Sequence, residues 1–241
     1  MAIDQDLAAE VLAEVLPGRP VRSYPALLST EADALAWARA GGPPGALVVA
    51  GYQASPRGRA GLPWVTTQGR GLGFSLVLRP RLPPDREGWI YTAAASGLAD
   101  ALGEDVVIAW PDEARRRGVR VGAVGASVEL GPDGVVWAVV SVLVPEAAPP
   151  RAPLLARVIQ AVEARLQAPP ATVLGDYLPR CQTIGRRVRA RLIPLGPAGL
   201  QVEGRAVDAL ADGALVIETT TGRQMAVRPQ HLGLLDELDS G

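Results

Sequence analysis

The 241-residue sequence contains no lysine and no asparagine, so all 24 of its basic residues are arginine. Alanine, glycine, valine, leucine, proline and arginine dominate instead. Because the codons of lysine and asparagine are rich in adenine, this bias is typical of a GC-rich genome. The absence of lysine excludes chemistry that needs its side chain, including Schiff-base formation, a lysine nucleophile and a P-loop lysine.

Cysteine and histidine are almost absent too, with Cys181 and His231 as the sole examples. One cysteine cannot form an internal disulfide, and one histidine cannot build a metal cluster. The formal net charge of −1 offers no electrostatic footprint for nucleic acid. No apolar run approaches the ~18 residues that span a bilayer, and no signal peptide is visible. We therefore predict a soluble, cytoplasmic protein without nucleic-acid or membrane partners.

Hydrophobic residues make up 48% of the chain, enough for a substantial core, and aromatics only 4%, so that core is largely valine, leucine and alanine. Hydrophobic periodicity predicts helices at 6–16, 29–40, 89–102 and 154–167. It predicts strands at 23–28, 46–51, 73–79, 106–110, 119–130 and 135–144. Between them, 115–118 is interpreted as a hairpin tip and Pro169-Pro170 as a break.

The pattern changes after Arg180, where short strands alternate with glycine turns. The predicted strands lie at 188–193, 200–209, 214–219 and 224–228. Such spacing is typical of a small β barrel of roughly 55 residues.

Three segments, in this order, resemble the biotin–protein ligases. The first, GYQASPRGRAGLPW at 51–64, is similar to the family's biotin loop and is followed by a strand-like segment at 73–80. The second, IAWPDE at 108–113, stands where the family has K-W-P-N-D. The third is the C-terminal barrel, with GRRV at 185–188 and VEGRA at 202–206, which is similar to the family's SH3-like domain.

The resemblance implies an α/β (α+β) fold, in which a mixed-sheet catalytic domain at 1–182 precedes an SH3-like β barrel at 183–241. The catalytic fold is related to class II tRNA synthetase cores and lipoate ligases. Only about two dozen residues precede Ser29, so we expect the DNA-binding winged helix of some members to be absent. Family members often dimerise, and nothing in this sequence decides whether a homodimer forms.

The resemblance also implies a two-step reaction. Biotin and Mg²⁺-ATP form biotinyl-adenylate, and the activated acyl group then passes to a lysine of a biotin carboxyl-carrier protein. The first step brings a carboxylate against the α-phosphate, and cations and backbone N–H groups must offset the repulsion of these anions. A glycine- and arginine-rich loop suits this task, because glycines let the backbone close over a ligand and arginines supply fixed charge.

Residues of this sequence take family roles by their positions in the motifs. Arg57 and Arg59 match the catalytic arginines of the loop. The residues that match substrate-binding positions of the family are Ser29, Thr30, Gln53, Gly58, Gly61 and Trp64. Arg120 or Gly125 adds one further position, since the family's K-L-x-G-I-L aligns with one or the other unless a gap is introduced. Asp112 and Glu113 match the acidic end of K-W-P-N-D and are candidate Mg²⁺ ligands.

The sequence departs from the family pattern at several of these positions. The family's lysine in K-W-P-N-D is Ala109, although the rest of the chain replaces lysine with arginine. Pro56 and Leu62 replace a glycine and an arginine of the loop. Where the family has a G-I-G-I-N-V strand, this sequence has VVSVLV at 139–144. The glycines and the asparagine of the family are replaced by valine, leucine or serine, which predicts a narrower nucleotide pocket. Losing a cation from a transition-state clamp costs about 3 kcal/mol or more, so we expect adenylation to be impaired or lost.

Two classes of function therefore remain open. One is a divergent biotin–protein ligase, with biotin, ATP and Mg²⁺ as cofactors or substrates and a carboxyl-carrier protein as partner. The other is a catalytically impaired homologue that binds a ligand or a partner on the ligase scaffold. A lipoate or octanoate ligase relative is a further alternative, although the barrel and the Q-x-x-x-R-G-R pattern favour biotin.

The remaining single residues are interpreted structurally. Trp110 follows an apolar run and is expected in the core. Cys181 is expected to be a buried, inert thiol, and His231 to lie on the surface. The Arg115–Arg117 run is expected to be a solvated hairpin tip.

Overall fold

The computed structural model describes residues 5–61, 64–65, 69–196 and 199–238. It contains a seven-stranded mixed sheet in the order β1-β2-β3-β7-β6-β5-β4. These strands are β1 (Val21–Tyr24), β2 (Leu47–Ala50), β3 (Leu72–Leu78), β4 (Val107–Ala109), β5 (Glu113–Arg116), β6 (Val119–Gly131) and β7 (Gly134–Val144). Only the β1–β2 pair is parallel, and the other neighbours are antiparallel.

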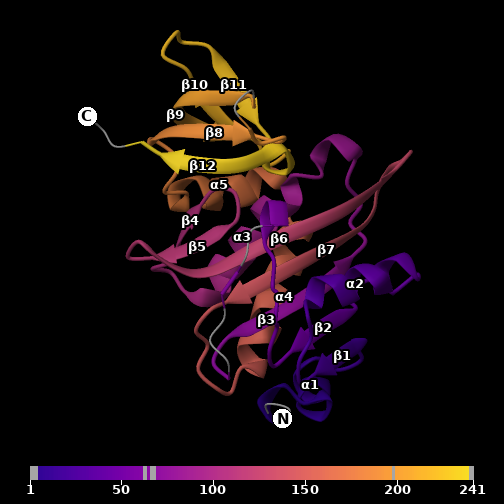
Figure 1. Cartoon of the computed structure of the whole chain (residues 1–241). Coiled ribbons are helices and arrows are strands. Elements are labelled where there is room, and N and C mark those ends of the chain that lie inside the picture. Colours follow the sequence, from indigo (N-terminus) through magenta and orange to yellow (C-terminus); the bar gives the residue numbers. More distant parts are fainter. Residues whose placement is uncertain (1–4, 62–63, 66–68, 197–198, 239–241) are drawn as a thin grey trace.

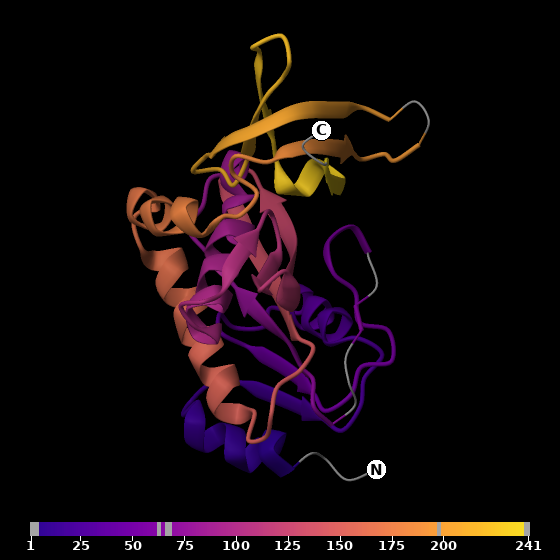
Figure 2. The ribbon, with the colours of Figure 1, turned by 90° about the vertical axis from the view of Figure 1, so that its left-hand side faces the viewer.

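Helices cover both faces of this sheet, as Figure 2 shows with the sheet between α2 and α4. The helices are α1 (Ala9–Val15), α2 (Thr30–Arg39), α3 (Trp89–Leu102), α4 (Ala152–Gln167) and α5 (Pro170–Arg180). α2 packs on β3 and β7, whereas α3 packs on β6 and against α4. In α4 the buried residues Leu155, Val158, Ile159 and Val162 follow the spacing of one helical face, which explains why it lies on the core.

The C-terminal segment forms a separate five-stranded antiparallel sheet in the order β11-β10-β9-β8-β12 (Figure 1). Its strands are β8 (Arg187–Leu192), β9 (Gln201–Ala209), β10 (Leu215–Glu218), β11 (Gln224–Val227) and β12 (Leu232–Glu237). Short 3₁₀ turns lie at Gln5–Leu7, Arg59–Gly61, Pro84–Arg86 and Pro229–His231. The mixed α/β domain followed by a small β domain confirms the predicted fold class.

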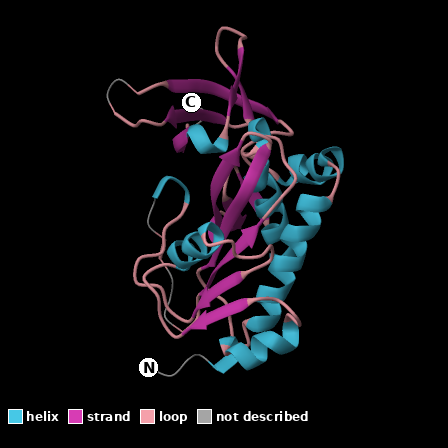
Figure 3. Cartoon of the chain, turned by 90° about the vertical axis from the view of Figure 1, so that its right-hand side faces the viewer, coloured by secondary structure: helices cyan, strands magenta, loops and turns pink. Residues whose placement is uncertain are grey.

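The two sheets share one hydrophobic core and several polar contacts. The indole Nε1 of Trp110 donates to the Gly213 carbonyl at 3.0 Å, and the Trp110 amide donates to Thr183 Oγ1 at 3.0 Å. The main chain of Gln182 also donates to the Ile108 carbonyl. These bonds tie the end of β4 to the C-terminal segment, and Figure 3 shows the small β domain at one end of the mixed sheet. The predicted domain boundary at 182/183 falls in this connection, between α5 and β8.

Two elements differ from the sequence-based expectation. Helix α4 ends at Gln167, so Pro169-Pro170 does mark a break, but Pro170 also occupies the first turn of α5, a helix that the sequence did not predict and whose first turn needs no N–H there. Strand β12 was not expected at all. In addition, Arg115 and Arg116 belong to β5, and the tight turn is made by Arg117 and Gly118, whose φ angles are 51° and 80°.

No helix in the described part of the chain is long and apolar enough to cross a bilayer.

Candidate functional site

The segment that follows β2 forms a buried polar contact with the start of α2. Gln53 is 7% exposed, and its Oε1 accepts hydrogen bonds from the Thr30 amide at 2.8 Å and from Thr30 Oγ1 at 3.1 Å. The amide is one of the unpaired N–H groups at a helix N-terminus, so Gln53 acts as a cap from outside the helix. Ser29, half-buried at the N-cap position, makes no capping bond with its side chain.

This contact continues as a chain of buried hydroxyl groups across the sheet. Thr30 Oγ1 lies 2.9 Å from Ser75 Oγ, which lies 2.8 Å from Ser141 Oγ. Ser75 and Ser141 are direct partners in the β3–β7 ladder. Each isolated serine lies in an apolar strand and gives no local signal, so the sequence predicted neither of them.

Gly73 makes room for the Gln53 side chain. A Cβ atom at Gly73 would collide with Gln53 Nε2, so only glycine permits this close approach. The sequence placed Gly73 merely at the start of a strand, although its lack of a side chain is what lets Gln53 lie against β3.

The rest of the loop folds back onto β6. Trp64 is 7% exposed and packs with Ala123 and Leu143, and its indole lies where a Cβ of Gly58 would be. The Trp64 amide donates to the Pro56 carbonyl at 3.1 Å. A Cβ at Gly125 would lie only 3.6 Å from the main chain of Gly58 and Arg59. The structure thus brings Gly58, Trp64 and Gly125, three of the predicted substrate-binding positions, close together.

The two loop arginines have different surroundings. Arg59 is 8% exposed, and its NH1 donates to the main-chain carbonyls of Leu232 at 2.5 Å and Gly233 at 3.2 Å, both in β12. Its Nε lies 3.4 Å from Asp112 Oδ2 but has no hydrogen-bond partner in the described part of the chain. Arg57 is exposed, and its NH1 donates to the Gly61 carbonyl at 3.4 Å.

Burial controls the ionisation of Asp112. It raises the pKa of the Asp112 carboxyl to about 6, because desolvation outweighs the opposing effect of Arg59, and Glu113 raises the pKa further. The Asp112–Arg59 pair is therefore a buried contact between a fixed cation and a carboxyl group that titrates within two units of neutral pH.

A cavity of about 370 Å³ lies beside this pair, at the junction of the two sheets. Ala109, 7% exposed, lines it together with Arg59, Asp112, Thr183 and Leu234. The methyl group of Ala109 carries no charge into the cavity, so Arg59 and Arg115 are its cationic lining residues.

Asp112 and Glu113 do not fit a magnesium site. Both oxygens of Glu113 are engaged, one by Arg115 at 2.7 Å and the other by Arg120 at 3.4 Å. Within the described ranges, no group of three or more His, Cys, Asp or Glu residues could hold a metal ion. Arg120 thus pairs with Glu113, and these two carboxylates do not provide a ligand set for Mg²⁺.

The exposed fractions of three further residues agree with their predicted positions in the core or on the surface. Trp110 and Cys181 are buried at 3% and 4% exposure, and His231 is exposed. The Cys181 thiol contacts the Tyr177 hydroxyl, itself buried. Leu62 lies outside the described residues.

The sequence resembles two curated proteins over part of its length. It is 33% identical over 100 residues to the bifunctional ligase/repressor BirA of Bacillus subtilis and 35% identical over 89 residues to that of Bacillus spizizenii. These stretches cover 40% and 35% of this chain but only 31% and 27% of the relatives, so the match spans less than a third of their length. No family model matches the chain.

The fold resembles solved structures along most of the chain. The biotin protein ligase of Aquifex aeolicus in complex with biotin and ATP superimposes with a TM-score of 0.70 at 19% identity, covering 91% of this chain and 99% of that one. A biotin protein ligase-like protein of unknown function from Silicibacter sp. gives a TM-score of 0.65 at 16% identity, covering 89% and 96%.

The chain therefore has the biotin protein ligase fold, with a catalytic-type α/β domain and a small C-terminal β domain. The sequence likeness to BirA is confined to part of the chain, and the two solved structures, at 19% and 16% identity, show a shared fold.

Proposed function

We propose that this biotin protein ligase-like protein binds biotin through the Thr30–Gln53 contact. The observation that carries this proposal is the buried polar chain from Gln53 through Thr30 and Ser75 to Ser141. A cyclic urea offers two N–H donors and one carbonyl acceptor, and these groups need polar partners inside an apolar pocket. Gln53 Nε2 can donate and the Thr30 and Ser75 hydroxyls can donate or accept, so the set provides complementary partners.

The proposed function also includes activation of the biotin carboxylate. Attack on ATP needs cations near the reacting carboxylate and phosphate. Position 109 supplies none, and the guanidinium of Arg59 already donates to two β12 carbonyls. We propose that the protein forms biotinyl-adenylate slowly, with Arg59 as the remaining buried cation of the loop. A carboxyl-carrier protein is the proposed acceptor of the acyl group.

The alanine at position 109 favours a second candidate function. If Arg59 stays bound to β12 and Arg115 stays paired with Glu113, neither lining cation reaches the carboxylate, and the protein binds biotin or a partner without catalysing transfer. This is the non-catalytic alternative on the same scaffold.

Two measurements separate these functions. Calorimetry with biotin on the full chain should show binding that the Gln53→Leu variant loses, whereas lipoate should bind more weakly. Biotin-dependent ATP–pyrophosphate exchange should lie above background. Binding without exchange leaves the second candidate, and the absence of both biotin binding and exchange contradicts the proposed function.

A further inference from the structure

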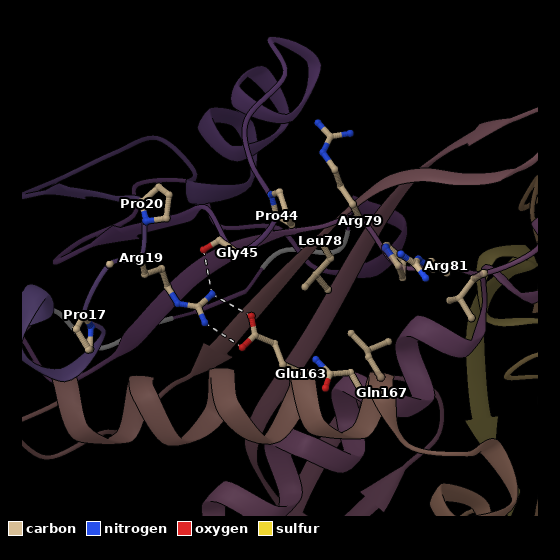
Figure 4. Close-up of a pocket in the computed structure, with 14 residues that line it drawn as sticks. Pro17, Arg19, Pro20, Pro44, Gly45, Leu78, Arg79, Arg81, Glu163 and Gln167 are labelled. Atoms are coloured by element: carbon tan, nitrogen blue, oxygen red, sulfur yellow. Dashed lines mark hydrogen bonds and ion pairs between the residues drawn. The ribbon is translucent and has the colours of Figure 1, made fainter.

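A second cavity, of about 660 Å³, lies at the end of the sheet opposite the Gln53 site. Its walls come from the connection between α1 and β1, the residues before β2, the residues after β3 and the last turns of α4 (Figure 4). Gln53 follows β2 and lies beside Gly73 at the start of β3, whereas Gly45 precedes β2 and Leu78 ends β3. Arg79 lies six positions after Gly73 along an extended chain that rises about 3.3 Å per residue, so the two sites are about 20 Å apart.

An ion pair forms the floor of this cavity. Arg19 donates to both oxygens of Glu163 at 2.9 Å and to the Gly45 carbonyl at 3.0 Å. The two side chains are 17% and 27% exposed. Because this bidentate pair neutralises itself, Glu163 does not offset the charge of the other arginines that line the cavity.

Those other arginines are Arg79 and Arg81. Arg79 is directed away from the Arg19–Glu163 pair (Figure 4) and donates to the carbonyls of Ala38, Gly42 and Val136, which carry no formal charge. Arg81 is exposed and has no hydrogen bond or ion pair to any other described residue. Two positive charges thus remain uncompensated by the carboxylate that lines the cavity.

The remaining walls are apolar and conformationally restricted. Prolines at 17, 20, 44 and 80 have fixed φ angles, and Leu78 and Leu166 contribute aliphatic surface. A hollow of this volume with apolar walls and a charged group at its rim has the size and lining of a small-molecule site.

We propose that this cavity binds a small carboxylate with an aliphatic body, whose anionic group pairs with Arg81. The aliphatic part contacts the prolines, Leu78 and Leu166, and the carboxylate accepts the free guanidinium donors. This site is independent of the Thr30–Gln53 site, so its failure does not bear on biotin binding.

The test compares three probes that differ only in their polar group: hexanoate, hexan-1-ol and hexylammonium. With ¹⁵N-labelled full chain, hexanoate should shift the amide resonances of Gly18 and Gly45. It should bind about tenfold more tightly than hexan-1-ol, because only the anion forms an ion pair with the arginine guanidinium. Hexylammonium should not compete with hexanoate.

Variants locate the binding. Arg81→Gln should weaken hexanoate binding about fivefold or more, and Gln167→Trp should obstruct the cavity from the exposed end of α4. Arg223→Gln, at an exposed arginine of the C-terminal sheet, and Gln53→Leu, in the other site, should leave hexanoate binding unchanged. Equal affinity for hexanoate and hexan-1-ol, no shifts at Gly18 and Gly45 at about 10 mM, or full binding by both cavity variants would overturn the proposal.

Discussion

The guanidinium of Arg59 donates to the main-chain carbonyl of Leu232, a residue 173 positions away in the sequence. The loop between β2 and β3 is therefore held by β12, a strand of the C-terminal sheet. The same guanidinium lies 3.4 Å from Asp112 Oδ2, so one cation joins the loop, the end of β4 and β12. The C-terminal domain thus contributes directly to the candidate site.

Replacing Arg59 with methionine, which keeps length but not charge, should lower the free energy of unfolding by about 2 kcal/mol. The two β12 carbonyls lose a charged donor, and Asp112 loses its partner. Arg57→Met is the matched control: Arg57 is exposed two positions away, and its loss should change stability by less than about 0.5 kcal/mol. Urea denaturation measures both, and equal effects would show that Arg59 does not stabilise the junction.

Asp112 should make stability depend on pH. Its folded-state pKa of about 6 lies above the usual value of 3.8, so its neutral form is favoured by folding. That contribution is complete below the unfolded-state pKa and is lost as pH rises through about 6, a difference of about 3 kcal/mol. Asp112→Asn should therefore gain stability relative to the parent protein between pH 4 and 7. A pH-independent difference between the two unfolding curves would refute the assignment.

Gly73→Ala should disturb the Gln53 site although it replaces none of the polar residues of that site. The added methyl group meets Gln53 Nε2, so Gln53 must move away from Thr30, and biotin affinity should fall about tenfold or more. Gly175→Ala is the control, because a Cβ at this position in α5 has open space and should leave binding intact. Calorimetry with biotin distinguishes them, and an unchanged affinity in Gly73→Ala would mean that Gln53 does not contact the ligand.

Ala109→Lys should raise biotin-dependent pyrophosphate exchange about tenfold or more, because the new ammonium group enters the cavity beside Arg59. Ala109→Met adds similar length without charge and should not raise exchange. If both variants behave alike, the missing cation is not what limits adenylation, and the β-branched residues at 139–144 are the next candidates.

The sequence predicted most elements because their signals are local. The helix at Trp89–Leu102 and most strands of the mixed sheet follow from hydrophobic periodicity and glycine turns, whereas β5 lies where the sequence predicted a hairpin tip. Helix α5 was missed because Pro169-Pro170 was interpreted as a break, although proline is compatible with a first helical turn. Strand β12 is short and follows a 3₁₀ turn, and its pairing partner β8 lies about 40 residues earlier.

Some residues of the candidate site were proposed from the sequence and others were not. The loop motif identified Gln53, Arg59 and Trp64, because their order and spacing are properties of the chain alone. Ser75 and Ser141 were not identified, because an isolated serine in an apolar strand acquires a role only when the β3–β7 register places the two hydroxyls side by side.

The sequence alone determined which charges this protein can place in the site. Without lysine, and with alanine at 109, no cation can come from that position, whatever the fold. Only the tertiary structure decided where the remaining charge lies. Arg59 carries a cation to the junction of the two sheets because β12 presents two main-chain carbonyls there, and such a contact depends on the packing of distant segments rather than on any local pattern.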